Sequence, residues 1–475
     1  RRSSDLRTEG TAVFESRDYF SDVLYMRLQG LSGLHPLIQL RNFSNQIKSR
    51  TFPIAEYARF IRTDVANVRS QLVTFAHHGF LTYNQEQQIV TLKDKVFHYV
   101  GAYVGNNDFD ALRIESVAPV NAILNMNNFD LHVKGVEKIP LSDARNVVIH
   151  PNNHEVIMKK NRDMSFHGRI ESGLFDFFGK EFHFDYGRFK INLVNTDSMS
   201  FRVRSFEPDS RGEYSEVRVR TVLEGINGEL IIDRPNNKSG RLQVQGYPVF
   251  NSNNESFVYY DREFVQSGVY RRENFYFRII PFSIDSLDMA TTYNILFDGV
   301  FISTGIFPDF YDYLTVQRDY SLGFNTHTPP EGFPIYDGRA LYKGPINLSY
   351  EGLRTDGQLI YLNADIQVNQ MYMFPDSARA LVRSFDLASQ VQPIEYPQIG
   401  ARDLNMHFLP YENRMTLNST THPMRFYDGI AQKAGQIELT PQGVSGNGRM
   451  SFYNSELTSN SFDYNRLSFT ASEAD

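Results

Sequence analysis

The sequence predicts a mainly β fold, an elongated array of repeated antiparallel β units that is solenoid-like or built of stacked sheets. A small α+β unit of winged-helix type is expected before the array. Three observations lead to this prediction. Short runs rich in Phe, Tyr, Ile and Val alternate with Gly, Pro, Asn and Asp, as strands alternate with turns. Two glycine-punctuated stretches repeat one pattern. Near the N-terminus, apolar residues recur at the three- and four-residue steps of helices.

The composition is that of a folded chain, and it excludes several kinds of chemistry. The 475 residues are 41% hydrophobic and 22% charged, which suits two to four ordinary domains or one repeat array. There are 38 Phe and 27 Tyr but no Cys, so disulfides, thiolate catalysis and cysteine-ligated zinc are excluded. A formal charge of −7 argues against bulk attraction to nucleic acid or to an anionic membrane surface. No apolar run reaches the roughly 18 residues that a transmembrane helix needs.

Two helices are expected within residues 1–100. Proline suits a first helical turn, which predicts a helix over Pro53–Ile61. A longer helix is predicted over Val65–His78, where Asp64 can cap its start and Gly79 can end it. Its apolar residues recur at three- and four-residue steps: Val65, Val68, Leu72 and Phe75.

A hairpin is expected directly after these helices. Phe80–Tyr83 and Ile89–Leu92 have strand composition, and the polar residues Asn84–Gln87 separate them. Helix, helix, hairpin is the order of a winged-helix unit, which would bind DNA through its second helix. That helix carries only Arg69 and two histidines as basic groups, whereas phosphate contacts require several Lys or Arg. We therefore expect no nucleic-acid partner, and a packing or protein-interaction role for this unit.

Nearly everything after about residue 115 is predicted to be strand. Gln243–Phe250, Asn274–Ile284 and Tyr293–Ile302 are rich in aromatic and branched residues and are bounded by turn formers. One short helix is predicted as an exception, over Ser377–Ser389.

An internal repeat is the strongest signal in the sequence. Gly344–Tyr361 aligns without gaps with Gly435–Phe452, at an offset of 91 residues. Glycines coincide at three positions and apolar residues match apolar residues, which predicts a strand, a glycine-containing turn and a second strand in each copy. Gly225–Ile232 carries part of the same pattern. Units of this kind bury their apolar faces against their neighbours, as in a stacked array.

A second element recurs in the same order. Phe184–Phe189 resembles Phe462–Leu467, and each follows a Gly-Arg-apolar strand start, at Gly168 and at Gly448. The chain ends sooner after the second copy than the first copy would suggest, so we expect the last region to be truncated and more protein to follow. The predicted parts are a winged-helix-like unit over 1–100, a β-rich repeat region over 101–330 and a second, truncated one over 331–475.

Four segments carry a resemblance to a known group of proteins. Asn161–Ile170, Ser256–Asp261, Gly305–Phe310 and Leu439–Gly446 resemble segments of very large, repetitive, uncharacterised cell-envelope proteins of the Bacteroidota. The resemblance covers most of residues 100–475. It implies a bacterial envelope setting, in the periplasm or at the outer membrane, with other envelope proteins as partners. That group has no established activity, so the resemblance implies no catalytic residue.

His150–Glu155 is the only dense cluster of metal-capable side chains in the sequence. A metal site needs three or four ligands that converge. His150 and His154 would share a face only on a helix, and the intervening Pro-Asn-Asn predicts a turn. We therefore expect a polar loop with exposed histidines and no metal site.

Carboxylates near aromatic residues are the remaining catalytic candidates. Two such groups stand out: Asp261 and Glu263 beside Tyr259 and Tyr260, and Asp309 and Asp312 between Phe307 and Tyr313. Paired acids can cleave glycosides when a few ångströms separate them, but sequence spacing does not fix that separation. With 55 acidic residues in the chain, such neighbours arise by chance. Gly443–Gly446 lacks the spacing of a nucleophile elbow, and no nucleotide-binding motif occurs. The sequence assigns no catalytic, cofactor-binding or metal-binding residue.

Three functional hypotheses follow from different classes. The leading one is a non-catalytic structural or assembly scaffold of the cell envelope, because the repeat dominates and catalytic motifs are missing. The second is a hydrophobic-groove protein that bridges membranes and carries lipids, which would also allow peripheral membrane contact. Alternating strand residues such as Phe182 and Phe184, or Phe275 and Phe277, suit it, although any half-buried sheet alternates in this way. The third is a carbohydrate-binding or carbohydrate-active β protein, for which the aromatic residues would supply stacking surfaces.

Overall fold

The computed structural model describes residues 10–29, 33–446, 450–452, 461–464 and 467–470. It has 47% strand and 14% helix, with large antiparallel sheets, so the predicted mainly β class is confirmed. The chain forms two compact units: unit 1 holds 1–199, 227–253 and 283–289, and unit 2 holds 200–226, 254–282 and 290–475. The chain thus passes between the units more than once. The expected three-part division remains a prediction.

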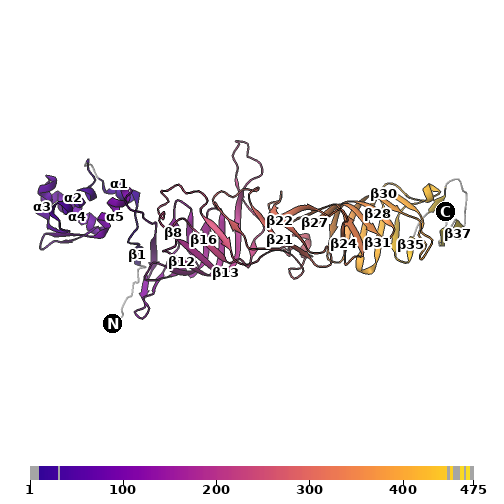
Figure 1. The fold of residues 1–475 in the computed structure, drawn as a ribbon, viewed down its shortest axis with the longest axis horizontal. Coiled ribbons are helices and arrows are strands. Elements are labelled where there is room, and N and C mark those ends of the chain that lie inside the picture. The colour runs from indigo at the N-terminus through magenta and orange to yellow at the C-terminus, as the bar shows by residue number, and fades with distance from the viewer. Residues whose placement is uncertain (1–9, 30–32, 447–449, 453–460, 465–466, 471–475) are drawn as a thin grey trace, which may run out of the picture. The chain divides into compact units, whose positions relative to one another are not determined.

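All five α-helices of the described residues belong to unit 1 and lie together in the indigo part of the chain in Figure 1. They are α1 (Asp22–Leu28), α2 (Pro36–Ile47), α3 (Ile54–Ile61), α4 (Val65–His77) and α5 (Asp94–Tyr103). A small antiparallel sheet accompanies them, formed by β2 (Thr51–Pro53), β3 (Leu81–Asn84) and β4 (Ile89–Leu92). Tyr25, Leu37, Tyr57, Leu72 and Tyr99 are among the residues that fill their common core, each at most 1% exposed.

The predicted helices α3 and α4 are confirmed, and so is the hairpin that follows them. One carboxylate oxygen of Asp64 accepts hydrogen bonds from the backbone N–H of Ala66, at 2.7 Å, and of Asn67, at 3.1 Å. This satisfies two of the N–H groups that a helix leaves open at its start. The chain leaves α4 through Gly79, whose φ of +74° suits a residue without a side chain.

The rest of unit 1 is β structure. Its strands are β1 (Gly10–Glu15), β5 (Arg113–Ala118), β6 (Ala122–Leu124), β7 (Leu131–Lys134), β8 (Ile139–Ser142), β9 (Val147–Pro151), β10 (Glu155–Met158), β11 (Met164–Ser172), β12 (Phe175–Asp185), β13 (Lys190–Arg204, in unit 2 from Ser200 on), β16 (Gly228–Ile231), β17 (Val249–Ser252) and β20 (Ser283–Ile284). In β12, Phe175, Phe177, Phe182 and Phe184 are buried while most residues between them are partly exposed. This alternation places one face of the strand in the core.

Unit 2 holds the other strands. They are β14 (Glu216–Arg218), β15 (Leu223–Glu224), β18 (Ser256–Tyr259), β19 (Phe275–Ile279), β21 (Leu296–Ser303), β22 (Phe310–Val316), β23 (Leu322–His327), β24 (Phe333–Ile335), β25 (Ala340–Lys343), β26 (Pro345–Ser349), β27 (Gly352–Tyr361), β28 (Ala364–Met373), β29 (Ala378–Leu387), β30 (Ile399–Leu409), β31 (Arg414–Ser419), β32 (Met424–Phe426), β33 (Ala431–Lys433), β34 (Gln436–Thr440), β35 (Gly443–Gly446), β36 (Met450–Phe452), β37 (Ser461–Tyr464) and β38 (Leu467–Thr470).

Some long strands of unit 2 pair with two different strands along the same edge. The first half of β27 pairs with β26, and its second half pairs with β25. The register of β27 against β28 shifts between Thr355 and Gly357, which marks a bulge. A bulge bends a strand and increases its twist. In the same way β30 pairs with both β31 and β32. Bent strands of this kind let successive hairpins pack over one shared core.

Two of the predicted elements are wrong. Ser377–Ser389 was expected to hold a helix, but Ala378–Leu387 is strand β29, paired with β28 on one side and β30 on the other. Ala378, Ala380, Val382, Phe385 and Leu387 are buried, which is nearly the two-residue period of a strand with one bulge. Gln243–Phe250 was expected to be strand, but β17 begins only at Val249.

The two glycine-punctuated stretches adopt the same hairpin. In the first, Ser349 pairs with Gly352 across the turn between β26 and β27. In the second, Thr440 pairs with Gly443 across the turn between β34 and β35. These pairs lie at the 91-residue offset of the sequence alignment. Gly352 and Gly443 have φ of +108° and +135°, in the region that favours glycine.

A second pair of hairpins obeys the same offset. Tyr336-Asp337-Gly338 and Tyr427-Asp428-Gly429 occupy the turns of β24–β25 and β32–β33, and all six residues have positive φ. The sequence analysis did not single out this tripeptide, although it is identical in the two places. Gly448, which matches Gly357, and Asn465–Arg466 of the second copy of Phe184–Phe189 lie outside the described residues.

Candidate functional sites

The predicted groups of acids and aromatic residues divide between the two faces of one sheet in unit 2. Tyr260 and Phe307 point into the core, at 0% and 4% exposure. The hydroxyl of Tyr260 donates a hydrogen bond to the backbone carbonyl of Leu322 at 3.0 Å. Tyr259 and Tyr313 lie on the opposite face, and Tyr313 is 51% exposed. Half of the predicted aromatic residues therefore have structural roles.

The outer face joins the two predicted groups into one surface. Tyr259 pairs with Tyr276 across β18 and β19, and their ring centroids are 6.0 Å apart. The next strands continue this face through β21 to β22, where Tyr311 is 74% exposed. We call this surface the tyrosine face; it comprises Phe257, Tyr259, Tyr276, Tyr311 and Tyr313. Neighbouring strands are about 4.8 Å apart, so the face spans roughly 14 Å from β18 to β22.

Ion pairs border the tyrosine face. The guanidinium of Arg272 lies 4.3 Å from the ring centroid of Tyr259, and its Nε donates to Asp261 at 2.8 Å. Its Nη1 donates to Glu224 at 3.3 Å. The hydrogen bond to Asp261, together with the charge of Glu224, raises the pKa of Arg272. Asp261 is thus engaged in an ion pair, and Arg272 bridges its carboxylate to that of Glu224. The face offers stacking surfaces and hydrogen-bonding groups.

The predicted histidine cluster does not converge. His150 lies on β9 with its Nε2 3.5 Å from a Glu171 carboxylate oxygen, whereas His154 Nδ1 lies 3.2 Å from the carbonyl of Val136. Glu155 pairs instead with His132, at 3.1 Å. Across the described part of the chain, no three His, Asp or Glu side chains are placed to hold a metal ion. Burial, with the charge of Arg169, lowers the pKa of His150.

A polar cluster in unit 1 connects the helical part to the sheet. The hydroxyl of Tyr186, in the loop after β12, donates to the Asp110 carboxylate at 2.6 Å. Arg162, in the turn after β10, donates to the same hydroxyl at 2.9 Å and stacks 3.8 Å above the Tyr186 ring. Arg162 also pairs with Asp18. Arg162 and Tyr186 belong to the two motifs singled out in the sequence, Asn161–Ile170 and Phe184–Phe189. In unit 1, therefore, these turns hold the helical part in place.

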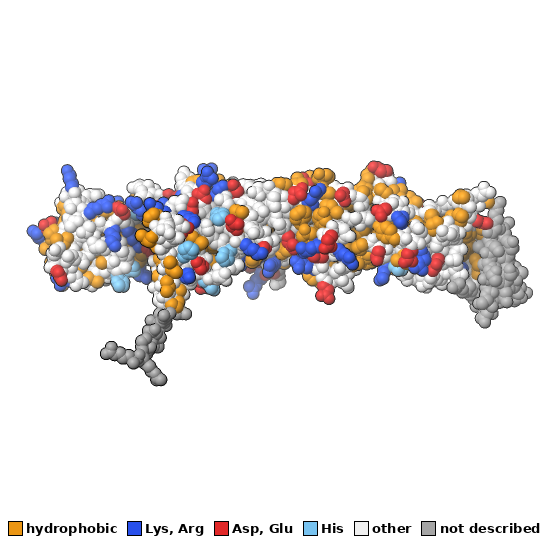
Figure 2. Space-filling model, turned by 90° about the horizontal axis from the view of Figure 1, so that it is seen from below, with side chains coloured by type: hydrophobic (Ala, Val, Ile, Leu, Met, Phe, Trp, Pro, Cys, Tyr) orange, Lys and Arg blue, Asp and Glu red, His pale blue; other side chains and the backbone are white. Residues whose placement is uncertain are grey.

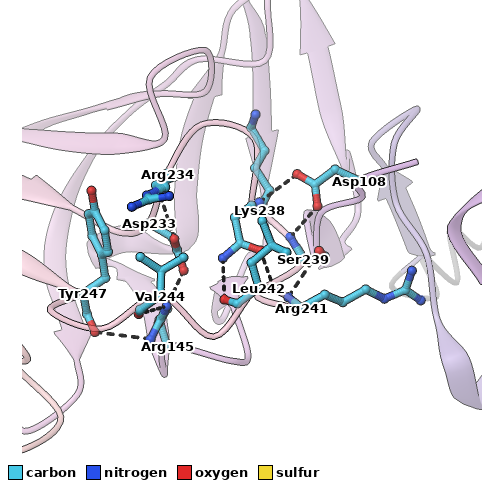
Figure 3. A network of polar contacts seen from close by, with 11 residues as sticks. Asp108, Arg145, Asp233, Arg234, Lys238, Ser239, Arg241, Leu242, Val244 and Tyr247 are labelled. Carbon is cyan, nitrogen blue, oxygen red and sulfur yellow. Dashed lines mark hydrogen bonds and ion pairs between the residues drawn. The ribbon is translucent and has the colours of Figure 1, made fainter. Parts of the chain in front are cut away.

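The loop between β16 and β17 makes a second connection, drawn in Figure 3. The backbone N–H groups of Lys238 and Ser239 donate to the Asp108 carboxylate, at 2.8 Å and 3.1 Å. Arg241 donates to the backbone carbonyl of Ala102, at the end of α5, and its guanidinium lies 4.7 Å from the ring centroid of Phe109. The loop therefore connects the end of the helical part to the sheet through hydrogen bonds.

The base of this loop contains a buried ion pair. The Asp233 side chain is fully buried and accepts a hydrogen bond from Arg145 Nε at 2.6 Å. Arg145 Nη2 donates to the backbone carbonyl of Val244 at 2.7 Å. A second oxygen of Asp233 accepts from the backbone N–H of Arg234, also at 2.6 Å. Both charges are thus satisfied inside the protein, as burial requires.

Sequence reasoning singled out neither Arg145 nor Asp233. The two residues are 88 positions apart, and neither stands in a motif. The available signal was weak: Asp233 ends an apolar run and precedes Arg-Pro-Asn-Asn, which predicts only a turn.

Unit 1 also has a cleft of about 690 Å³. Charged groups of both signs line it, including Asp22, Arg113, Glu137 and Lys138, with Phe20 and Phe109. The described lining has charges of both signs and no buried polar side-chain atom without a hydrogen-bond partner. It therefore favours no particular class of ligand.

Asp110 and Asp18 should respond to pH in opposite ways. Burial raises the pKa of Asp110 above its ordinary value of 3.8, although hydrogen bonds from Tyr186 and Leu112 oppose this. Burial also raises the pKa of Asp18, but its hydrogen bond and charge interaction with Arg162 outweigh burial, so the net pKa is lowered. Folded protein therefore holds the Asp110 proton more tightly than unfolded protein does, and the contribution of Asp110 to stability should be lost as pH rises from 3.8 through the raised pKa.

The Asp110→Asn variant should not show this loss. We expect its melting temperature, relative to wild type, to increase from about pH 4 to about pH 8. Asp18→Asn is the matched control. Because the pKa of Asp18 is lowered from 3.8, its carboxylate stabilises the fold fully above that value and loses this effect only on further acidification. The melting temperature of Asp18→Asn relative to wild type should therefore fall as the pH rises through the range at and below 3.8 and then stay nearly level up to about pH 8. Parallel pH profiles for the two variants would contradict this assignment.

The fold and these contacts define a mainly antiparallel β protein with an N-terminal helical part that polar contacts hold to the first sheet. The chain matches no protein-family model, no curated protein and no solved structure. Within the described residues, no helix combines the length and apolar character required to cross a bilayer.

Proposed function

We propose that this chain is a non-catalytic structural or assembly scaffold of a bacterial cell envelope, in the periplasm or at the outer membrane, with other envelope proteins as partners. One observation carries the proposal. Two hairpins recur at an offset of 91 residues with the same strand register and the same positive-φ residues in their turns. The strands between the two copies pair one after another, from β26 through β31 to β34. Units that pair with their neighbours can be added in series, which suits a spanning or presenting role.

The contacts of the charged side chains support the same proposal. Arg145, Arg162 and Arg241 each connect segments far apart in the chain. Charged groups used in this way stabilise the fold, whereas catalytic groups point into a cleft. Asp261 likewise forms an ion pair with Arg272.

We infer further that the β region is a solenoid-like array and that Thr51–Leu92 forms a winged-helix-like unit. The order α3, α4, β3, β4, with β2 beside β4, supports the second inference. Arg69 of α4 donates to the Gln88 side chain at 3.1 Å, so this basic group is held by the hairpin. That contact favours docking to protein over binding to phosphate.

Two measurements test the scaffold. Small-angle scattering of the purified chain should give a radius of gyration well above the roughly 23 Å of a compact 475-residue globule. In the bacterium that carries the gene, a deletion strain should regain the full wild-type phenotype when it expresses a variant with Glu263→Gln, Asp309→Asn and Asp312→Asn. A compact particle would contradict the array, and failure of this variant would contradict a non-catalytic role.

Glycan binding is a second candidate, and the tyrosine face is the observation that favours it. Aromatic rings on a flat sheet can stack on sugar rings. Retardation of the chain by polysaccharide in affinity electrophoresis, abolished by Tyr311→Ala, would support this candidate over the scaffold. The third hypothesis, a lipid-carrying groove, has less support because inward-facing residues such as Phe182, Phe277 and Leu359 are fully buried. A lipid chain would have to displace them.

A further inference from the structure

The hairpin of β6 and β7 in unit 1 presents an uncharged apolar tip. Ile123 and Leu124 are each 49% exposed, Met126 is 70% exposed and Phe129 is 50% exposed. Residues 119–129 contain no charged side chain; their polar members are all asparagines. Hydrophobic side chains also gather in several patches on the face drawn in Figure 2, so a single exposed apolar residue has no functional meaning. A continuous uncharged segment on a projecting turn differs from those patches.

Both faces of this hairpin are apolar at its tip. Leu124 pairs with Leu131 and continues the face on which Val133 is buried, whereas Ile123 lies on the opposite face beside His132. A half-buried hairpin would carry polar residues on its outer face. Apolar residues on both faces require an occupant that surrounds the tip.

The turn holds the tip in one conformation. The backbone N–H of Phe129 donates to the carbonyl of Asn125 at 2.8 Å, and the N–H of Asn125 donates to the carbonyl of Asp130 at 2.9 Å. Phe129 has a φ of +60°, a region that bulky residues rarely adopt and that an asparagine tolerates better. The chain nevertheless places a phenylalanine there, next to Asn128. The turn thereby holds the Phe129 ring at the surface, where it is 50% exposed.

Two lysines lie at the base of the tip, on the turn after β10, the strand that pairs with β7. Lys159 Nζ forms an ion pair with the Asp130 carboxylate at 2.7 Å. Lys160 is exposed, and its Nζ lies 5.5 Å from the ring centroid of Phe129. The net charge of the chain is −7, so any attraction to an anionic surface must be local. Lysine beside apolar side chains is the pattern of a membrane interface, where the amine remains at the headgroups.

We propose that the tip Val120–Phe129 inserts into the interfacial region of an anionic lipid bilayer, with Lys160 at the level of the headgroups. The insertion anchors the chain peripherally and does not depend on the scaffold role. An apolar groove of a partner protein is the competing occupant, and the experiment below separates the two. The lipid surface is favoured because it contacts both faces of a projecting tip and complements the lysine.

The test uses the full chain and vesicles of phosphatidylcholine with or without phosphatidylglycerol. Wild type should sediment with the anionic vesicles, and added salt should weaken binding. Met126→Ser with Phe129→Ser should weaken binding at least about tenfold, because two large apolar side chains are lost from the interface. Lys160→Gln should reduce the preference for phosphatidylglycerol. Tyr311→Ser removes an aromatic residue of unit 2 that is 74% exposed, more than Phe129, and should leave binding unchanged.

A site-specific label gives an independent readout. The chain contains no cysteine, so Met126→Cys provides a single position for an environment-sensitive dye. Emission should shift to the blue on addition of anionic vesicles, whereas a dye at Tyr293→Cys should not respond. Circular dichroism of each variant checks that the fold is retained. Absence of binding to anionic vesicles, equal binding by the double serine variant, or an unresponsive Met126→Cys dye would overturn the proposal. The first result would leave a protein groove as the occupant, and the other two would place the lipid contact elsewhere on the chain.

Discussion

Asp233→Ala is expected to unfold the loop between β16 and β17 in unit 1 and to lower the free energy of unfolding by about 3–5 kcal/mol. The Asp233 side chain is fully buried, and that of Arg145 is 13% exposed. Removing the carboxylate leaves a largely buried guanidinium without its counter-charge. The backbone N–H of Arg234 also loses its acceptor. The loss is large because desolvation of an unpaired charge exceeds the value of the pair itself.

Hydrogen exchange is the appropriate measurement, since two units need not unfold as one. Amides of β16, β17 and the loop between them should exchange faster in the variant, and those of β28 and β29 should not. Lys180→Ala is the control: its pair with Asp197, at 3.7 Å, is 74% and 52% exposed and should change stability by less than about 1 kcal/mol. Arg145→Met combined with Asp233→Leu should recover much of the stability. Normal exchange in Asp233→Ala would contradict the buried-pair assignment.

Phe301→Ala is expected to destabilise unit 2 by about 3–5 kcal/mol. Phe301 is fully buried in β21, where its ring centroid lies 5.3 Å from that of Phe275 and 5.1 Å from that of Phe324. Phe310 is the third ring, at 5.5 Å. Truncation to alanine removes these contacts and leaves a cavity that rigid strands cannot close.

Tyr311→Ala provides the matched control for this prediction. Tyr311 pairs with Val300, the neighbour of Phe301, but it lies on the tyrosine face and is 74% exposed. Its loss should change the free energy of unfolding by less than about 1 kcal/mol. Urea unfolding followed by circular dichroism and tyrosine emission would measure both variants. Equal effects of the two substitutions would mean that the core of unit 2 does not lie between Phe275 and Phe324.

The sequence was most informative where structure is set by neighbouring residues. Asp64 and the spacing from Val65 to Phe75 predicted α4, because capping and one-sided burial act within a few turns. The paired glycines predicted matching hairpins because positive φ is a local requirement. The helices α1, α2 and α5 were missed. Their signals were present, as the serine N-cap Ser21 of α1 and the buried Leu37, Leu40 and Phe43 of α2 show. Of these three helices, only α5 begins without a side-chain cap.

The candidate sites were less predictable, because they bring together residues that are distant in the sequence. Tyr259 and Tyr313 were noted from their acidic neighbours, but only strand pairing placed them on one face and Tyr260 in the core. The apolar tip Val120–Phe129 was visible as an uncharged run, yet its exposure depends on what packs nearby. Exposure is a property of the folded surface and is not encoded by the residue type.

By itself, the sequence determined the mainly β class, the helices α3 and α4, and the recurring turns at the 91-residue offset. Each of these follows from backbone preferences and side-chain periodicity over a few residues. Only the tertiary structure decided that Ser377–Ser389 contains a strand and that Asp233 is buried against Arg145, 88 residues away. A strand requires partners to complete its hydrogen bonds, and a buried charge requires a counter-charge. Both come from distant parts of the chain.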